Sequence, residues 1–168
     1  MTGAGAGHIV HTMNNDPHLL VGQAELETFQ KLMASLMQCC QEQSLYRCER
    51  FGLNESEQRT LLQFGDERYL TAKGLARKLN VAKSRVTKIV SGLVGKGLLQ
   101  RSQDPDDSRY TLLSLTHEGR RRQEELQAFL NALHAEALAK LSPSDRDMLL
   151  TSMGRLRLSM ESVKELLE

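Results

Sequence analysis

The chain has 168 residues, of which 40% are hydrophobic and 26% charged, ordinary values for one compact domain or a small domain with a dimerising part. Aromatic residues make up 4% and Trp is absent, so the core must rest on aliphatic residues and Met, a composition that favours helices. No stretch approaches the roughly 18 apolar residues that cross a bilayer, and we expect no membrane partner.

The N-terminal and cysteine patterns indicate the compartment. Residues 1–20 are rich in Gly, His and Asn and lack a secretory signal, and we expect them to form a flexible tail. The three cysteines, two of them adjacent, do not form a disulfide framework. We therefore expect a protein of the reducing cytoplasm.

The charge is unevenly distributed along the chain. Residues 68–109 hold ten basic residues against three acidic ones, a local charge of +7 in a chain whose net charge is +1. The remaining residues therefore carry −6. A basic middle between acidic ends indicates a segment that faces a polyanion, although a solvated charged surface explains the charge about as well.

The first predicted elements are helices. Apolar residues at helical spacing predict a long helix from about Gln23 to Arg50. Asn54 is a good N-cap, and Glu57 three residues later completes a pattern close to a capping box. A third helix begins at Thr71, and Asn80 stands where a left-handed terminator is expected.

A fourth helix and a hairpin follow directly. The helix runs from Ala82 to about Gly95. Two apolar runs, Gly97–Arg101 and Tyr110–Leu115, are joined by the polar segment Ser102–Arg109, whose Asp and Pro residues favour a turn. This pattern predicts a two-stranded hairpin with a long tip.

Two long helices end the chain. Thr116 caps the first, which continues to about Leu141, and Ser142 caps the second, with Pro143 at the first helical position. The predicted fold class is mostly α with a small β-hairpin, that is, α+β.

The outer helices define the expected domain organisation. The small central core cannot cover all of their apolar residues. The outer helices can bury these residues by packing against each other and against a second copy of the chain. We therefore expect a helical dimerisation region at residues 21–53 and 120–168 around a central domain at residues 54–119.

The fourth helix is strongly amphipathic. Val86, Val90 and Leu93 share an apolar face with Ile89. The opposite face presents cationic and hydroxyl side chains, namely Lys83, Ser84, Arg85, Thr87, Lys88 and Ser91. Such groups reach DNA phosphates and the acceptor edges of bases in the major groove, and Arg85 and Lys88 can bind guanine O6 and N7. Taken alone, this helix is interpreted equally well as an ordinary amphipathic surface helix whose cationic face is exposed to solvent.

The hairpin adds a second basic feature. Arg109 follows Asp107 by two residues at the base of the turn. An Arg held by a neighbouring carboxylate can project stiffly into the minor groove, whose negative potential attracts it. The alternative is an ordinary surface ion pair. Both features in this order, directly joined, are much more specific than either alone.

The chain resembles the MarR-type multiple-antibiotic-resistance regulators from about Asn54 to Gly119. The resemblance is carried by four segments, Leu70–Ala76, Val81–Val90, Leu93–Arg101 and Asp104–Arg109, and by Leu113-Ser-Leu-Thr-His-Glu-Gly119. It implies a winged helix-turn-helix protein that forms an obligate homodimer and binds a pseudo-palindromic operator in double-stranded DNA. It also implies a transcriptional regulator, in the usual case a repressor. A small ligand or oxidation usually relieves the repression.

The resemblance also implies residue roles. Ser84, Arg85, Thr87 and Lys88 would read the major groove, and Arg109, braced by Asp107, would enter the minor groove. Ala82 departs from the family, which often has a Ser that caps the reading helix; losing that cap costs roughly 1 kcal/mol.

Relatives often bind phenolic or other amphipathic acids between the dimer helices and the winged domain. In this chain, Met33, Met37, Tyr46 and Phe51 could line such a cleft for a small aromatic or amphipathic ligand, together with residues of the fifth helix. Apolar residues at helical spacing are more often core than ligand pocket.

A redox alternative rests on Cys39 and Cys40. Neighbouring side chains on a helix diverge by about 100°, so this pair cannot easily bridge. A redox-sensing regulator would need a cysteine from another chain or a sulfenic acid, with Tyr46 as a companion. A helical Cys is more often a small buried hydrophobe.

Other chemistries have little support in the sequence. His8, His11 and His18 lie in the tail without partners at ligand spacing, and we expect neither a metal nor another cofactor. The common hydrolase, phosphate-binding, metalloprotease and dinucleotide motifs are missing, so we do not expect an enzyme. Besides a DNA-binding regulator and an enzyme, the third class of protein to consider is a winged module that binds other proteins and not DNA.

Overall fold

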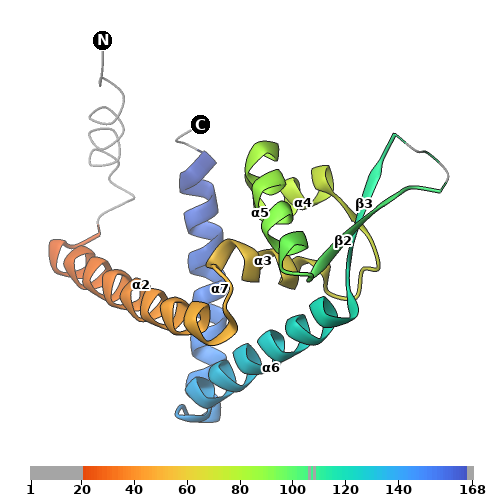
Figure 1. The fold of residues 1–168 in the computed structure, drawn as a ribbon. Coiled ribbons are helices and arrows are strands. Elements are labelled where there is room, and N and C mark those ends of the chain that lie inside the picture. Colours follow the sequence, from red (N-terminus) through yellow and green to blue (C-terminus); the bar gives the residue numbers. More distant parts are fainter. Residues whose placement is uncertain (1–20, 106, 108, 166–168) are drawn as a thin grey trace. The chain divides into compact units, whose positions relative to one another are not determined.

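The computed structural model describes residues 21–105, 107 and 109–165 (Figure 1). The tail predicted for residues 1–20 lies outside the described residues. By its contacts the chain divides into two compact units, the first ending at Leu53 and the second beginning at Asn54. Each unit is described by itself.

The first unit contains one long helix, α2 (Gln23–Phe51), which confirms the helix predicted from Gln23. Gly52 ends it in the left-handed conformation, with φ of 62°, and its N–H donates to the Cys48 and Glu49 carbonyls. Many apolar side chains of α2 are 40–66% exposed, namely Leu26, Phe29, Leu32, Leu36, Met37 and Leu45.

The second unit opens with three short helices, α3 (Glu55–Phe64), α4 (Ala72–Leu79) and α5 (Lys83–Gly95). The predicted capping box is confirmed, because Asn54 Oδ1 accepts the Glu57 N–H at 2.9 Å and Glu57 Oε2 accepts the Asn54 N–H at 2.9 Å. Asn80 adopts the predicted left-handed conformation, with φ of 53°. Ala82 offers α5 no side-chain cap.

The sheet has three antiparallel strands in the order β1-β3-β2: β1 (Leu70–Thr71), β2 (Leu99–Gln103) and β3 (Thr111–Leu115). The predicted hairpin is confirmed as β2 and β3, but β1, in which Leu70 pairs with Leu113 and adds a third strand, was not predicted from the sequence. The first hairpin strand also begins two residues later than predicted. Gly97, with φ of 69°, still belongs to the turn after α5.

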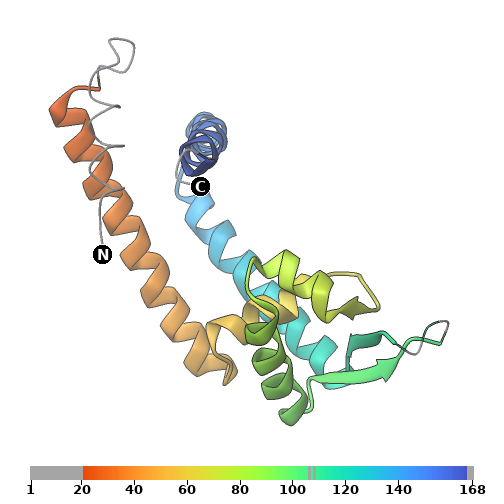
Figure 2. The ribbon, with the colours of Figure 1, turned by 90° about the horizontal axis from the view of Figure 1, so that it is seen from above.

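Two long helices follow, α6 (His117–Ala139) and α7 (Pro143–Glu165). Thr116 caps α6 by accepting the Gly119 N–H at 3.0 Å, and Ser142 Oγ accepts the Asp145 N–H at 3.2 Å, as predicted. Figures 1 and 2 show that α6 begins beside the sheet and ends on the far side of this unit, where α7 begins.

The core of the second unit lies between α3, α4, α5, the sheet and the start of α6. Its fully buried side chains are Leu61, Phe64, Leu75, Val86, Leu93, Leu99, Leu113 and Leu126. The predicted apolar face of α5 is buried at Val86, Val90 and Leu93 and half-buried at Ile89. The fold is thus mostly α with a small sheet, as predicted. Within the described ranges, no helix is long and apolar enough to cross a membrane.

Candidate nucleic-acid interface

The six polar residues predicted to share one face of α5 are all exposed. We call this set the α5 polar face: Lys83, Ser84, Arg85, Thr87, Lys88 and Ser91. Thr87 Oγ1 donates to the Lys83 carbonyl at 3.1 Å, so this hydroxyl is held against the helix. Ser91 Oγ accepts from Arg101 Nη2 at 2.9 Å. The face therefore combines three cationic side chains with short hydroxyls.

A mostly buried carboxylate fixes the C-terminal end of α5. Lys96 follows the helix, and its Nζ lies 2.7 Å from Glu57 Oε2, on a side chain that is 5% exposed. The same Glu57 oxygen accepts the Asn54 N–H, so one carboxylate caps α3 and holds α5. A Cβ at Gly92 would lie 3.0 Å from Glu57 Oε1, which leaves little room for a larger residue there.

The surface between α5 and the start of α3 is concave. An open hollow of about 540 Å³ lies there, and Arg85, Lys88, Asn54 and Glu55 are among the residues that line it. Two cations of the α5 polar face thus border a depression that also holds acidic residues of the first turn of α3.

The connection between β2 and β3 carries the predicted Arg–Asp pair. We call β2, β3 and their connection the wing. Arg109 Nε donates to Asp107 Oδ1 at 2.9 Å and Nη2 donates to Oδ2 at 2.7 Å. The Arg109 backbone N–H also donates to Asp107 Oδ1 at 3.1 Å. The side chain of Arg109 is 84% exposed, so the carboxylate orients it without covering it.

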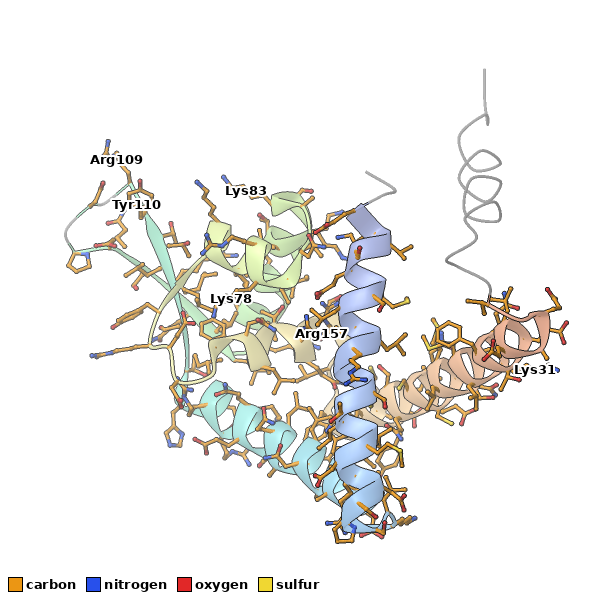
Figure 3. All side chains as sticks on the ribbon, turned by 180° about the vertical axis from the view of Figure 1, so that it is seen from behind. Lys31, Lys78, Lys83, Arg109, Tyr110 and Arg157 are labelled. Atoms are coloured by element: carbon orange, nitrogen blue, oxygen red, sulfur yellow. The ribbon has the colours of Figure 1, made fainter. Side chains whose placement is uncertain are left out.

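Electrostatics agree with this geometry. The hydrogen bonds from Arg109 lower the pKa of the Asp107 carboxyl below its ordinary 3.8, and the carboxylate in turn raises the pKa of the guanidinium. Both groups therefore stay ionised at neutral pH. Figure 3 shows Arg109 in the wing and Lys83 at the start of α5 at the same side of the second unit. Both predicted basic features are therefore exposed, and the residues of each that Figure 3 labels, Lys83 and Arg109, lie at one side of the second unit.

The four predicted ligand-pocket residues all lie on α2. Met33 is half-buried, Phe51 is buried, and Met37 and Tyr46 are 58% and 54% exposed. All four belong to the first unit, so a pocket shared with α6 of the second unit stays a prediction.

Cys39 and Cys40 are exposed, whereas Cys48 is half-buried. In the single chain, both adjacent cysteines therefore lie on the surface of α2. Among the described residues, no group of His, Cys, Asp and Glu could hold a metal ion. His8, His11 and His18 lie outside the described residues.

Two contacts were not found from the sequence. The Glu57–Lys96 pair joins residues 39 positions apart, and the Arg101–Ser91 bond joins a strand to a helix. The excess of basic residues in the middle of the chain and the family resemblance over Leu93–Arg101 both include Lys96 and Arg101, but neither indicates these contacts.

The arrangement of α4, a tight turn, α5 and the hairpin defines a winged helix-turn-helix protein. The MarR family profile matches residues 53–111. The uncharacterised HTH-type transcriptional regulator YdgJ of Bacillus subtilis is 30% identical over 117 residues, which is 70% of each chain. The chain therefore belongs to the MarR family of transcriptional regulators, not to an enzyme family.

Solved structures give the same fold. The crystal structure of YusO from Bacillus subtilis is 26% identical, with a TM-score of 0.64 over 83% of this chain and 99% of that one. FabT of Streptococcus pneumoniae, solved in complex with DNA, has a TM-score of 0.72 at 19% identity, over 80% of this chain and 99% of that one. The second of these similarities concerns the fold alone.

Proposed function

We propose that this regulator is a homodimeric repressor that binds a pseudo-palindromic operator in double-stranded DNA and is released by a small aromatic or amphipathic ligand. One observation carries the DNA-binding role: Lys83, at the start of the exposed α5 polar face, and the braced Arg109 lie at the same side of the second unit (Figure 3). The DNA complex of FabT, a protein with the same fold, supports DNA as the partner. A DNA partner also implies a cytoplasmic protein.

The α5 polar face would lie in the major groove. Arg85 and Lys88 supply donors for guanine O6 and N7, and Lys83 supplies charge for a phosphate. Ser84 and Thr87 are short, so they let the helix approach the base edges. Arg109 would enter the neighbouring minor groove, where Asp107 holds the guanidinium plane through two hydrogen bonds.

Dimerisation is supported by apolar surface on the outer helices. Helix α7 has no buried side chain among its described residues, although it carries seven large hydrophobic residues that are 38–63% exposed, namely Met148, Leu149, Leu150, Met153, Leu158, Met160 and Val163. Residues 21–53 and 120–168 would form the dimerisation region, with residues 54–119 as the winged domain. Exposed apolar surface of this extent is typical of a protein interface. Two copies would then present their α5 helices about 34 Å apart, one turn of DNA.

Ligand release would follow from this dimer. A ligand between the dimerisation region and the winged domain, near Met33, Met37, Tyr46 and Phe51, would change the spacing of the two α5 helices. Helices at a different spacing no longer fit successive grooves, and the affinity for the operator falls.

Exposure of Cys39 and Cys40 favours oxidation as a second candidate signal. If peroxide releases DNA, the Cys39→Ser and Cys40→Ser variants should resist it. Unchanged DNA affinity of the wild-type protein after peroxide would exclude this candidate.

The proposal is tested by fluorescence anisotropy with duplex DNA from upstream of the protein's own gene and with random-sequence duplex, in a salt series. Wild-type protein should bind as a dimer, and its affinity should fall steeply with salt. Arg109→Ala should weaken binding to both duplexes. Arg85→Ala should relax sequence preference by about 1–3 kcal/mol.

Lys140→Gln is the control, because Lys140 is exposed and is the C-cap of α6, a helix whose C-terminal end lies on the far side of the second unit from the wing (Figure 1). Equal losses on both duplexes for Arg85→Ala would refute its base-reading role. A folded dimer that binds neither duplex at low salt would refute the DNA-binding proposal and favour a winged protein-interaction module.

A further inference from the structure

An open hollow of about 350 Å³ lies between α5 and the wing, within the second unit. Its apolar lining comes from Ala72, Val90 and Leu113, and its polar lining comes from hydroxyl side chains and one guanidinium, namely Thr87, Ser91, Thr111 and Arg101. The hollow thus has the donors that bind a phosphate group, at the surface that separates the two predicted DNA-reading elements.

Arg101 is held in this hollow by one oriented hydrogen bond. It lies on β2 opposite Leu113 and is exposed, and its Nη2 donates to Ser91 Oγ on α5 at 2.9 Å. An arginine has five N–H donors in a rigid fork, of which this bond uses one. Ser91 therefore fixes the plane of the guanidinium across the hollow, and the fork matches the oxygens of a phosphate.

We propose that Arg101, oriented by Ser91, binds a backbone phosphate of double-stranded DNA. This inference rests on the proposed docking, in which α5 enters the major groove and Arg109 the adjacent minor groove. One sugar–phosphate strand always separates two adjacent grooves, so it must cross the molecule between α5 and the tip of the wing. The hollow that holds Arg101 lies there. In this arrangement Ser91 is a positioning residue for Arg101 rather than a reader of bases.

The test measures anisotropy of labelled upstream and random-sequence duplexes between 50 and 200 mM KCl. Arg101→Gln should lose about tenfold in affinity at low salt for each protomer bound, equally on both duplexes, as expected for a lost charged hydrogen bond. The slope of its plot of log affinity against log salt should be shallower by about 0.9 for each protomer bound. Between 50 and 200 mM KCl, each lost contact therefore makes the salt-dependent fall in affinity about 3.5-fold smaller. Lys140→Gln should keep the wild-type affinity and slope.

Ser91→Ala should lose a few-fold in affinity, and it should lose nothing further when combined with Arg101→Gln. Such non-additivity is expected only if both residues act through one contact. Arg101→Lys keeps the charge and should keep the wild-type salt slope with a smaller loss of affinity. This variant decides the question if circular dichroism shows that Arg101→Gln is unfolded.

Several results would overturn the inference while leaving the proposed function intact. One is a wild-type salt slope in a folded Arg101→Gln variant, and another is a loss of affinity that is confined to the upstream duplex. The others are fully additive losses of affinity for Ser91→Ala and Arg101→Gln, and a reduced salt slope in Arg101→Lys. If the wild-type protein binds neither duplex, the proposed function fails and this inference fails with it.

Discussion

Replacing Gly119 by Ala tests the tight junction between the sheet and α6. A Cβ at this position would lie 1.9 Å from the Leu98 carbonyl oxygen and 2.9 Å from its carbonyl carbon. Non-bonded heavy atoms are comfortable at roughly 3.5 Å. Because both colliding groups belong to the backbone, no side-chain rotation relieves the overlap, and the start of α6 must move away from the chain before β2.

The cost of that movement follows from the hydrogen bonds at the junction. The Thr116 N–H donates to the Leu98 carbonyl at 3.1 Å, and Thr116 Oγ1 donates to the Gly97 carbonyl at 2.7 Å. Weakening these two bonds costs about 0.5–1.5 kcal/mol each, and overpacking adds about 1–3 kcal/mol. We therefore expect Gly119→Ala to lower the free energy of unfolding by about 2–6 kcal/mol.

Thermal and urea unfolding followed by circular dichroism measure this loss, at one fixed protein concentration because dimerisation affects stability. The expected fall in Tm is roughly 4–24 °C, at about 2–4 °C per kcal/mol for a chain of this length. Gly154→Ala is the matched control, because a Cβ at Gly154 in α7 meets no atom within 4 Å. It should be neutral or stabilising by up to about 1 kcal/mol. If Gly119→Ala is as stable as Gly154→Ala, the steric reasoning is wrong.

Three further predictions concern the α3 cap, the wing and the dimer. Glu57→Ala removes the acceptor of the Asn54 N–H and a mostly buried ion-pair partner, and it should cost about 1–3 kcal/mol in urea unfolding; Glu57→Gln should cost less, and equal losses would contradict this account. Because the folded pKa of Asp107 is lowered, its pair with Arg109 is fully formed above the ordinary pKa and is lost only as the pH falls through the folded value. An NMR titration of Asp107 should therefore give a midpoint below 3.8 that rises in Arg109→Gln, whereas an unchanged midpoint would exclude the pair in solution. Leu150→Glu places a charge on the apolar surface of α7 and should give monomers in light scattering, whereas a charged substitution on the α5 polar face should not; a dimeric Leu150→Glu would argue against α7 as an interface.

The helices could be predicted because their signals are local. Asn54, Asn80 and Pro143 act within a few residues of the helix ends that they mark, so their types alone indicate a cap, a left-handed stop and a first turn. Strand β1 could not be predicted in the same way. Its two residues, Leu70 and Thr71, are too few to show alternation, and only the pairing with β3 makes them a strand.

In the candidate interface, too, the local features could be predicted from the sequence and the long-range contacts could not. The exposure of the α5 polar face follows from helical periodicity, and the pair of Asp107 and Arg109 follows from their separation of two residues. The bond between Ser91 and Arg101 depends instead on the turn at Gly97, which sets how β2 leaves α5. Its partners lie ten residues apart across that turn, and no residue pattern specifies the geometry.

Helix α5 and the tip of the wing are fixed by separate means. The end of α5 is tied to the first turn of α3 by a mostly buried carboxylate, Glu57, whereas Arg109 is held by Asp107 two residues away and owes little to the core. Changes at Glu57 should therefore shift the residues that read bases while the brace stays intact. Loss of Asp107 should release Arg109 and leave α5 in place. Sequence preference and general affinity for DNA should accordingly respond to different substitutions.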